Sequence, residues 1–147
     1  MRTYRHILVA LTMLGIVGFS TAAKAEDPGI TVEIRSIAAD KQGEGFDSKL
    51  SDLKSKLEKV FDDYTRFEQL TSVEFELTPH QTKSVTLPEG SQISVTYHGP
   101  ADDLLKIGLE ISDKLSTTLR ASPGSTFFQA GLDYRSGILI LAITVDK

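Results

Sequence analysis

The chain has 147 residues, a net charge of −4 and no cysteine. Without cysteine there can be no disulfide bond, thiolate metal site or cysteine nucleophile, so a hydrophobic core has to stabilise the fold. The acidic balance, with no basic cluster, argues against nucleic acid and anionic lipid surfaces as partners.

The N-terminus has the three parts of a bacterial secretory signal. Arginines come first, residues 7–19 are almost entirely apolar, and Ala23 and Ala25 supply the small side chains that signal peptidase recognises. The apolar run is shorter than the roughly 20 residues of a membrane-spanning helix, although an uncleaved anchor is the alternative. We predict a signal peptide over residues 1–25, cleaved after Ala25, and one exported domain over residues 26–147. That domain is expected to be periplasmic or secreted, with no membrane span.

The predicted domain begins with a strand and a helix. Ile30, Val32 and Ile34 alternate with polar residues, which is typical of a strand with one buried face. The polar stretch 38–45 predicts a loop. Residues 46–64 have apolar side chains at spacings of three and four, which predicts an amphipathic helix docked on a sheet. The residues of this apolar stripe are Phe46, Leu50, Leu53, Leu57, Val60, Phe61 and Tyr64.

After the helix the apolar pattern changes to a period of two, which predicts a series of strands. They are expected at residues 73–77, 82–87, 93–97, 105–111, 115–119, 126–130 and 138–145. Leu87-Pro88-Glu89-Gly90 predicts a hairpin turn, and Gly99-Pro100 predicts the end of a strand. Residues 131–137, with a glycine at each end, are expected to form a loop.

The last predicted strand, residues 138–145, differs from the others because it is apolar on both faces. Such a strand has to be covered on both sides. We therefore place it centrally in a sheet, with the helix on one face and other strands over the opposite face. The expected class is α+β, with about seven or eight mainly antiparallel strands in a sandwich or strongly curved sheet.

These landmarks resemble a group of small, uncharacterised secreted bacterial proteins. The resemblance covers about residues 50–145 and rests on the helix, the turn at 87–90, the Pro-Gly turn at 123–124 and the apolar C-terminal strand. It implies export and this fold, but no known activity. The segment from Leu119 onward is also similar to the C-terminal β-hairpins of secretins, which build outer-membrane export channels.

One local group is the best candidate for catalysis or metal binding. His98 with Asp102 and Asp103 could bind a divalent cation or act as acid and base, although a solvated loop is the alternative. Zinc needs three or four ligands, and the other histidine of the predicted domain, His80, lies at the end of a separate predicted strand. We expect no metal and no cofactor. No nucleophile elbow, phosphate loop or dinucleotide fingerprint occurs, so no catalytic residue is assigned.

The candidate binding residues are Tyr134 and Arg135 in the predicted loop 131–137, because these two residue types dominate interface hot spots. A tyrosine that packs back on the sheet is the alternative. The sequence favours an exported, non-enzymatic binding or structural module of the cell envelope, with another envelope protein as partner. The alternatives are a small hydrolase or metal-dependent enzyme that uses His98, Asp102 and Asp103, and a strand-pairing subunit of an envelope or secretion assembly.

Overall fold

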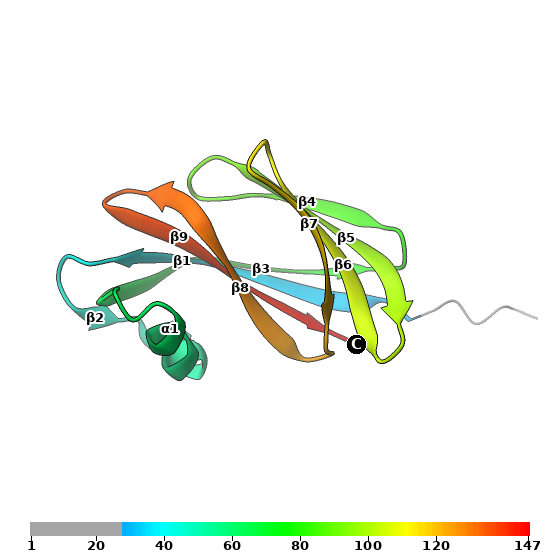
Figure 1. Ribbon diagram of the computed structural model, residues 1–147, viewed down its shortest axis with the longest axis horizontal. Coiled ribbons are helices and arrows are strands. Elements are labelled where there is room, and N and C mark those ends of the chain that lie inside the picture. Colours follow the sequence, from blue (N-terminus) through cyan, green and yellow to red (C-terminus); the bar gives the residue numbers. More distant parts are fainter. Residues whose placement is uncertain (1–27) are drawn as a thin grey trace, which may run out of the picture.

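The computed structural model describes residues 28–147, which form two β-sheets and one short helical segment (Figure 1). The predicted signal peptide and its cleavage site lie outside the described residues and stay predictions. The fold is α+β with strongly curved, mainly antiparallel sheets, as the sequence predicts.

The first sheet has five strands in the order β2-β3-β1-β9-β8. Its strands are β1 (Ile30–Asp40), β2 (Gly45–Phe46), β3 (Arg66–Leu77), β8 (Ser125–Tyr134) and β9 (Gly137–Asp146). All neighbours are antiparallel except β2 and β3, which form a short parallel pair. The strands β1 and β9 are therefore central, and β8 is an edge.

The second sheet has four antiparallel strands in chain order, and it packs over part of one face of the first sheet (Figure 1). Its strands are β4 (Thr82–Thr86), β5 (Gln92–Ala101), β6 (Leu104–Ile111) and β7 (Leu115–Ala121). The predicted hairpin turn between β4 and β5 is confirmed: the amide of Gly90 donates to the carbonyl of Leu87 at 2.9 Å.

The two faces of β9 line two different hydrophobic cores. Leu139, Leu141, Ile143 and Val145 face the core between the sheets, whereas Ile140 and Ala142 face the helical segment. All six side chains have 0% exposure. The predicted central strand, covered by strands on one face and by the helix on the other, is confirmed.

The helical segment is shorter than the predicted 46–64. It consists of a 3-10 helix, η1 (Ser48–Leu53), followed by α1 (Lys54–Val60). Asp47 caps its start and accepts hydrogen bonds from the amides of Lys49 and Gln69 at 3.0 and 3.1 Å. Phe46 therefore belongs to β2, where its ring centroid lies 5.6 Å from that of Phe67. Val60, expected in the apolar stripe, is 59% exposed.

Two predicted strand endings are wrong. The glycines that suggested a loop or a strand end lie in β-bulges, and the strands continue past them. The register of β8 against β9 shifts between Gln129 and Leu132, and Gly131 there has a φ of 116°. The strand continues through this bulge to Tyr134, so most of the predicted loop 131–137 is strand. In β5, Gly99 has a φ of 95° at a similar shift, and the strand continues to Ala101.

Candidate functional site

The site that the sequence suggested lies at the tip of the β8–β9 hairpin. The strands are joined by a tight turn at Arg135 and Ser136, and Arg135 has a φ of 51°, in the left-handed region. Gly137 follows, and a Cβ there would overlap the carbonyl oxygen of Ala39 and lie 2.9 Å from the Cα of Asp40. The turn therefore packs directly on the end of β1, and this close approach requires glycine.

The side chains of Tyr134 and Arg135 stack on each other at this tip. The guanidinium carbon of Arg135 lies 4.9 Å from the centroid of the Tyr134 ring, within the range of a cation–π contact. Tyr134 is half-buried against the core between the sheets, and Arg135 is exposed. No carboxylate in residues 28–147 forms an ion pair with Arg135. Its N–H donors are therefore available to a partner.

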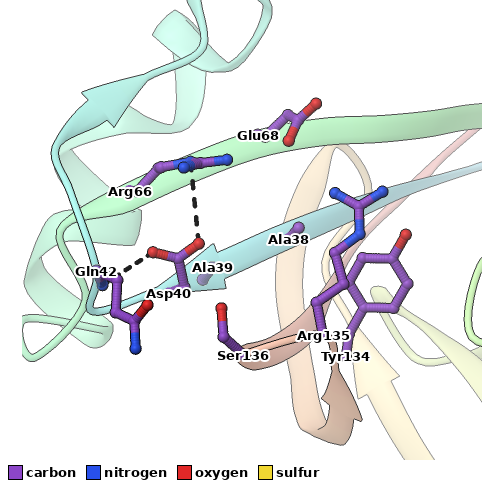
Figure 2. Close-up of a pocket in the computed structure, with 9 residues that line it drawn as sticks. All are labelled: Ala38, Ala39, Asp40, Gln42, Arg66, Glu68, Tyr134, Arg135 and Ser136. Carbon is purple, nitrogen blue, oxygen red and sulfur yellow. Dashed lines mark hydrogen bonds and ion pairs between the residues drawn. The ribbon is translucent and has the colours of Figure 1, made fainter.

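A cleft of about 140 Å³ lies beside this pair (Figure 2). It is formed by the hairpin turn, the end of β1 and the start of β3. The lining residues are Ala38, Ala39, Asp40, Gln42, Arg66, Glu68, Tyr134, Arg135 and Ser136. Asp40 connects two of the lining residues. Its Oδ1 accepts a hydrogen bond from the backbone amide of Gln42 at 3.0 Å, and its Oδ2 lies 3.9 Å from Nε of Arg66.

The charges in the cleft are not equivalent. Asp40 engages Arg66, which leaves Arg135 and Glu68 as the charged side chains without an ion pair among the described residues. Arg135 projects from the turn and Glu68 from β3 (Figure 2). A guanidinium offers five donors in a planar fork that fits a carboxylate. The cleft thus has the chemistry to hold a polar segment of a partner.

The structure places the second predicted group, His98 with Asp102 and Asp103, in two locations. His98 lies on the outer face of β5, above Gly108 of β6, in a cleft lined mainly by serine and threonine. Neither aspartate lines that cleft, because both belong to the turn between β5 and β6. Within residues 28–147 there is no group of three or more His, Asp or Glu side chains that could hold a metal ion.

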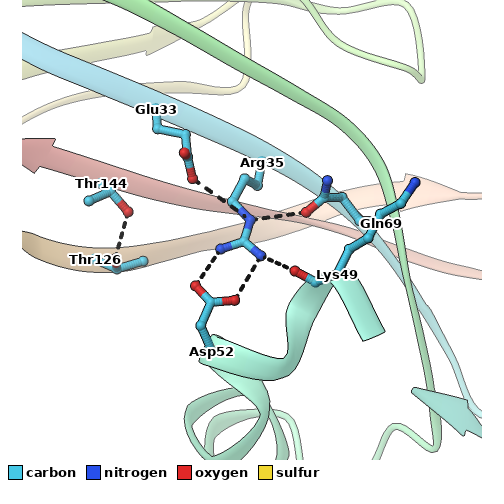
Figure 3. A network of polar contacts seen from close by, with 7 residues as sticks. All are labelled: Glu33, Arg35, Lys49, Asp52, Gln69, Thr126 and Thr144. Carbon is cyan, nitrogen blue, oxygen red and sulfur yellow. Dashed lines mark hydrogen bonds and ion pairs between the residues drawn. The ribbon is translucent and has the colours of Figure 1, made fainter. Parts of the chain in front are cut away.

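Sequence reasoning missed one polar network, centred on Arg35 (Figure 3). Its guanidinium donates to both carboxylate oxygens of Asp52 at 2.8 and 3.0 Å and to the carbonyl of Lys49 at 2.7 Å. Its Nε donates to Gln69 Oε1 at 3.0 Å. The bond from Arg35 lowers the pKa of Asp52 below its usual value. Because these donors are already satisfied, we assign the network to fastening η1 on the first sheet.

The alternation of the first predicted strand placed Arg35 on a solvated face, together with Thr31 and Glu33. That face is polar from Thr31 to Arg35, but η1 covers it at Arg35, which is only 8% exposed. The available signal was an acidic residue, Asp52, on the polar side of the predicted helix. Nothing in the sequence pairs that acid with an arginine on a strand.

Comparisons with known proteins give no relative. No protein-family model matches the chain, and neither the curated proteins nor the solved structures contain a significant match. The resemblances to small secreted bacterial proteins and to secretin hairpins therefore stay predictions. Among residues 28–147, no helix is long and apolar enough to cross a membrane.

Proposed function

We propose that this protein is an exported, non-enzymatic binding module of the bacterial cell envelope. In this proposal, it holds a protein partner at the cleft beside Tyr134 and Arg135. The observation that carries the proposal is an exposed arginine, stacked on a tyrosine at 4.9 Å and unpaired with any carboxylate of the described chain. The group that best fits Arg135 is a carboxylate, which a guanidinium binds through two parallel hydrogen bonds.

The packing of the hairpin tip supports this role. Binding costs free energy when mobile side chains become ordered. Here the Tyr134 ring limits the freedom of Arg135, and Gly137 seats the turn on the backbone of β1. Less conformational entropy is therefore lost when a partner binds than for an arginine on a mobile loop.

The export part of the proposal rests on the N-terminal sequence. The arginines, the apolar run and Ala23-Lys24-Ala25 have the order and spacing of a secretory signal. An envelope protein is then the natural class of partner, because the mature chain would meet such proteins after export.

The cleft is tested by affinity capture from the envelope fraction of a bacterium that carries the protein. We expect Arg135→Ala and Tyr134→Ala each to weaken retention of the captured protein about thirtyfold, the effect of losing a hot spot of roughly 2 kcal/mol. Arg120→Ala is the matched control, since Arg120 is an exposed arginine on β7, away from this cleft. A protein captured equally by the wild type and Arg135→Ala would show that the cleft is not the contact.

A further inference from the structure

One side of the strand β8 has no hydrogen-bonded neighbour strand among residues 28–147, although the N–H of its first residue, Ser125, donates to the carbonyl of Ser122 at 3.0 Å in the preceding turn. The strand β8 is the terminal strand of the first sheet, and its hydrogen-bonded neighbour is β9. The strand has 10 residues, from Ser125 to Tyr134. Its backbone N–H and C=O groups that point away from β9 therefore have no strand to pair with among residues 28–147. Such an edge is a template for pairing with another chain.

The edges of the two sheets differ in charge. From Ser125 to Leu132, β8 contains neither a charged residue nor proline. On the opposite side of the first sheet, the two-residue strand β2 covers β3 only at Arg66 and Phe67, and the uncovered remainder of β3 carries Glu68, Glu74 and Glu76. In the second sheet, the edge strands β4 and β7 carry Lys83 and Arg120. Charged side chains are a common device that prevents edge pairing, and β8 lacks it up to Leu132.

We propose that β8 pairs antiparallel with β8 of a second copy of this chain, in a register centred on Phe127. Phe127 then lies opposite Phe127 of the second copy, and Ser125 lies opposite Gln129. The two five-stranded sheets become one continuous sheet across a two-fold axis. This inference is independent of the cleft at Arg135.

The register follows from the shape of the strand. The bulge after Gln129 interrupts regular pairing, so the regular part of β8 runs from Ser125 to Gln129, and Phe127 is its midpoint. Both Phe127 and Phe128 are only partly buried, and they pack against the two different cores. Pairing covers their remaining exposed surface and places two aromatic rings across the axis, a favourable cross-strand pair.

Although the chain as a whole is acidic, the position of the charged residue in β8 permits pairing with a second copy. The charged residue of β8 is Asp133, which lies about 20 Å along the strand from Phe127. In the antiparallel arrangement the two Asp133 side chains are therefore far apart, and no like charges face each other. The other long strand edges carry charged residues, so pairing of β8 about a two-fold axis occupies the one long uncharged edge and closes the assembly at a dimer.

The first test measures the mass in solution by sedimentation equilibrium. Its variants introduce charged residues at Ser125 and Gln129, which both lie on the edge strand β8 and are partly exposed. We expect the wild type to sediment with twice the chain mass at micromolar concentration. Ser125→Lys with Gln129→Lys places like charges opposite each other and should give a monomer. Ser125→Lys with Gln129→Glu places opposite charges there and should restore the dimer. Thermal unfolding checks that both variants fold.

A single cysteine gives the second test, because the chain has none of its own. On oxidation, Phe127→Cys should form a covalent dimer, since residue 127 faces itself across the axis. Ser116→Cys, on the edge strand β7, is the control and should stay monomeric. The inference is overturned if the wild type is monomeric, if the two charge variants have the same mass, or if Ser116→Cys cross-links as readily as Phe127→Cys.

Discussion

At the scale of single residues, the arginine network under η1 should make a measurable contribution to stability. Asp52 supplies two of the acceptors of the nearly buried Arg35, at 2.8 and 3.0 Å. We expect Asp52→Ala to lower the free energy of unfolding by about 1–2 kcal/mol and no more, since the side chain of Asp52 is itself 62% exposed. Urea unfolding measures this. Glu58→Ala is the control, because its exposed pair with Lys54 contributes about 0.5 kcal/mol or less.

The same pair predicts a pH dependence. The hydrogen bond from Arg35 lowers the pKa of Asp52 from its usual 3.8. A group whose pKa is lower in the folded state stabilises the fold above its unfolded pKa, and this contribution is lost as the pH falls through the folded pKa. The stability difference between the wild type and Asp52→Asn should therefore be constant at neutral pH and shrink below pH 3.8. A difference unchanged at about pH 2 would contradict the assignment.

Two glycines in strands should respond differently to alanine. At Gly137 the new Cβ meets the backbone of Ala39, which cannot move without disturbing β1. At Gly108 it meets Nε2 of His98, an exposed side chain that can rotate away. We expect Gly137→Ala to lower the melting temperature by several degrees, corresponding to about 1–3 kcal/mol, and Gly108→Ala to have little effect. Equal shifts would show that the hairpin tip is not seated as described.

At the scale of elements, β9 is the strand that both cores share. Ile140 faces the helical segment and Leu141 faces the second sheet, and each has 0% exposure. Ile140→Asp and Leu141→Asp should therefore each give unfolded or insoluble protein, because an unpaired buried charge costs several kcal/mol and a whole domain has only about 5–15. Circular dichroism of the soluble fraction checks this. If one variant folds, the corresponding face of β9 is open to solvent or to a partner and is not covered by a core.

The elements that could be predicted are those with an uninterrupted pattern. The run of apolar residues in β9 predicted coverage on both faces, and the Leu-Pro-Glu-Gly turn predicted the β4–β5 hairpin. The length of β8 could not be predicted, since a glycine in a bulge and a glycine in a loop look alike in a sequence. Gly131 belongs to a bulge, and the decisive information is its pairing with β9.

At the scale of the whole molecule, the site depends on contacts between distant segments. The pair Tyr134 and Arg135 could be selected from residue type alone. The cleft beside it could not, because Asp40 and Arg66 reach it only when β1 and β3 pair next to β9. The group around His98 illustrates the reverse case: His98 lies on a face of β5, whereas its sequence neighbours Asp102 and Asp103 lie in the turn that follows the strand.

The hairpin tip and the β5–β6 turn lie at opposite ends of the molecule (Figure 1), which permits a direct test of the proposed contact. A photo-reactive amino acid is introduced into the protein at position 136, beside Arg135, or at position 103 in the other turn. Cross-linking is then carried out in living cells. We expect a cross-linked protein adduct from position 136 that Arg135→Glu abolishes, and no adduct from position 103. An adduct from position 103 alone, or one from position 136 that persists in Arg135→Glu, would contradict the proposed contact.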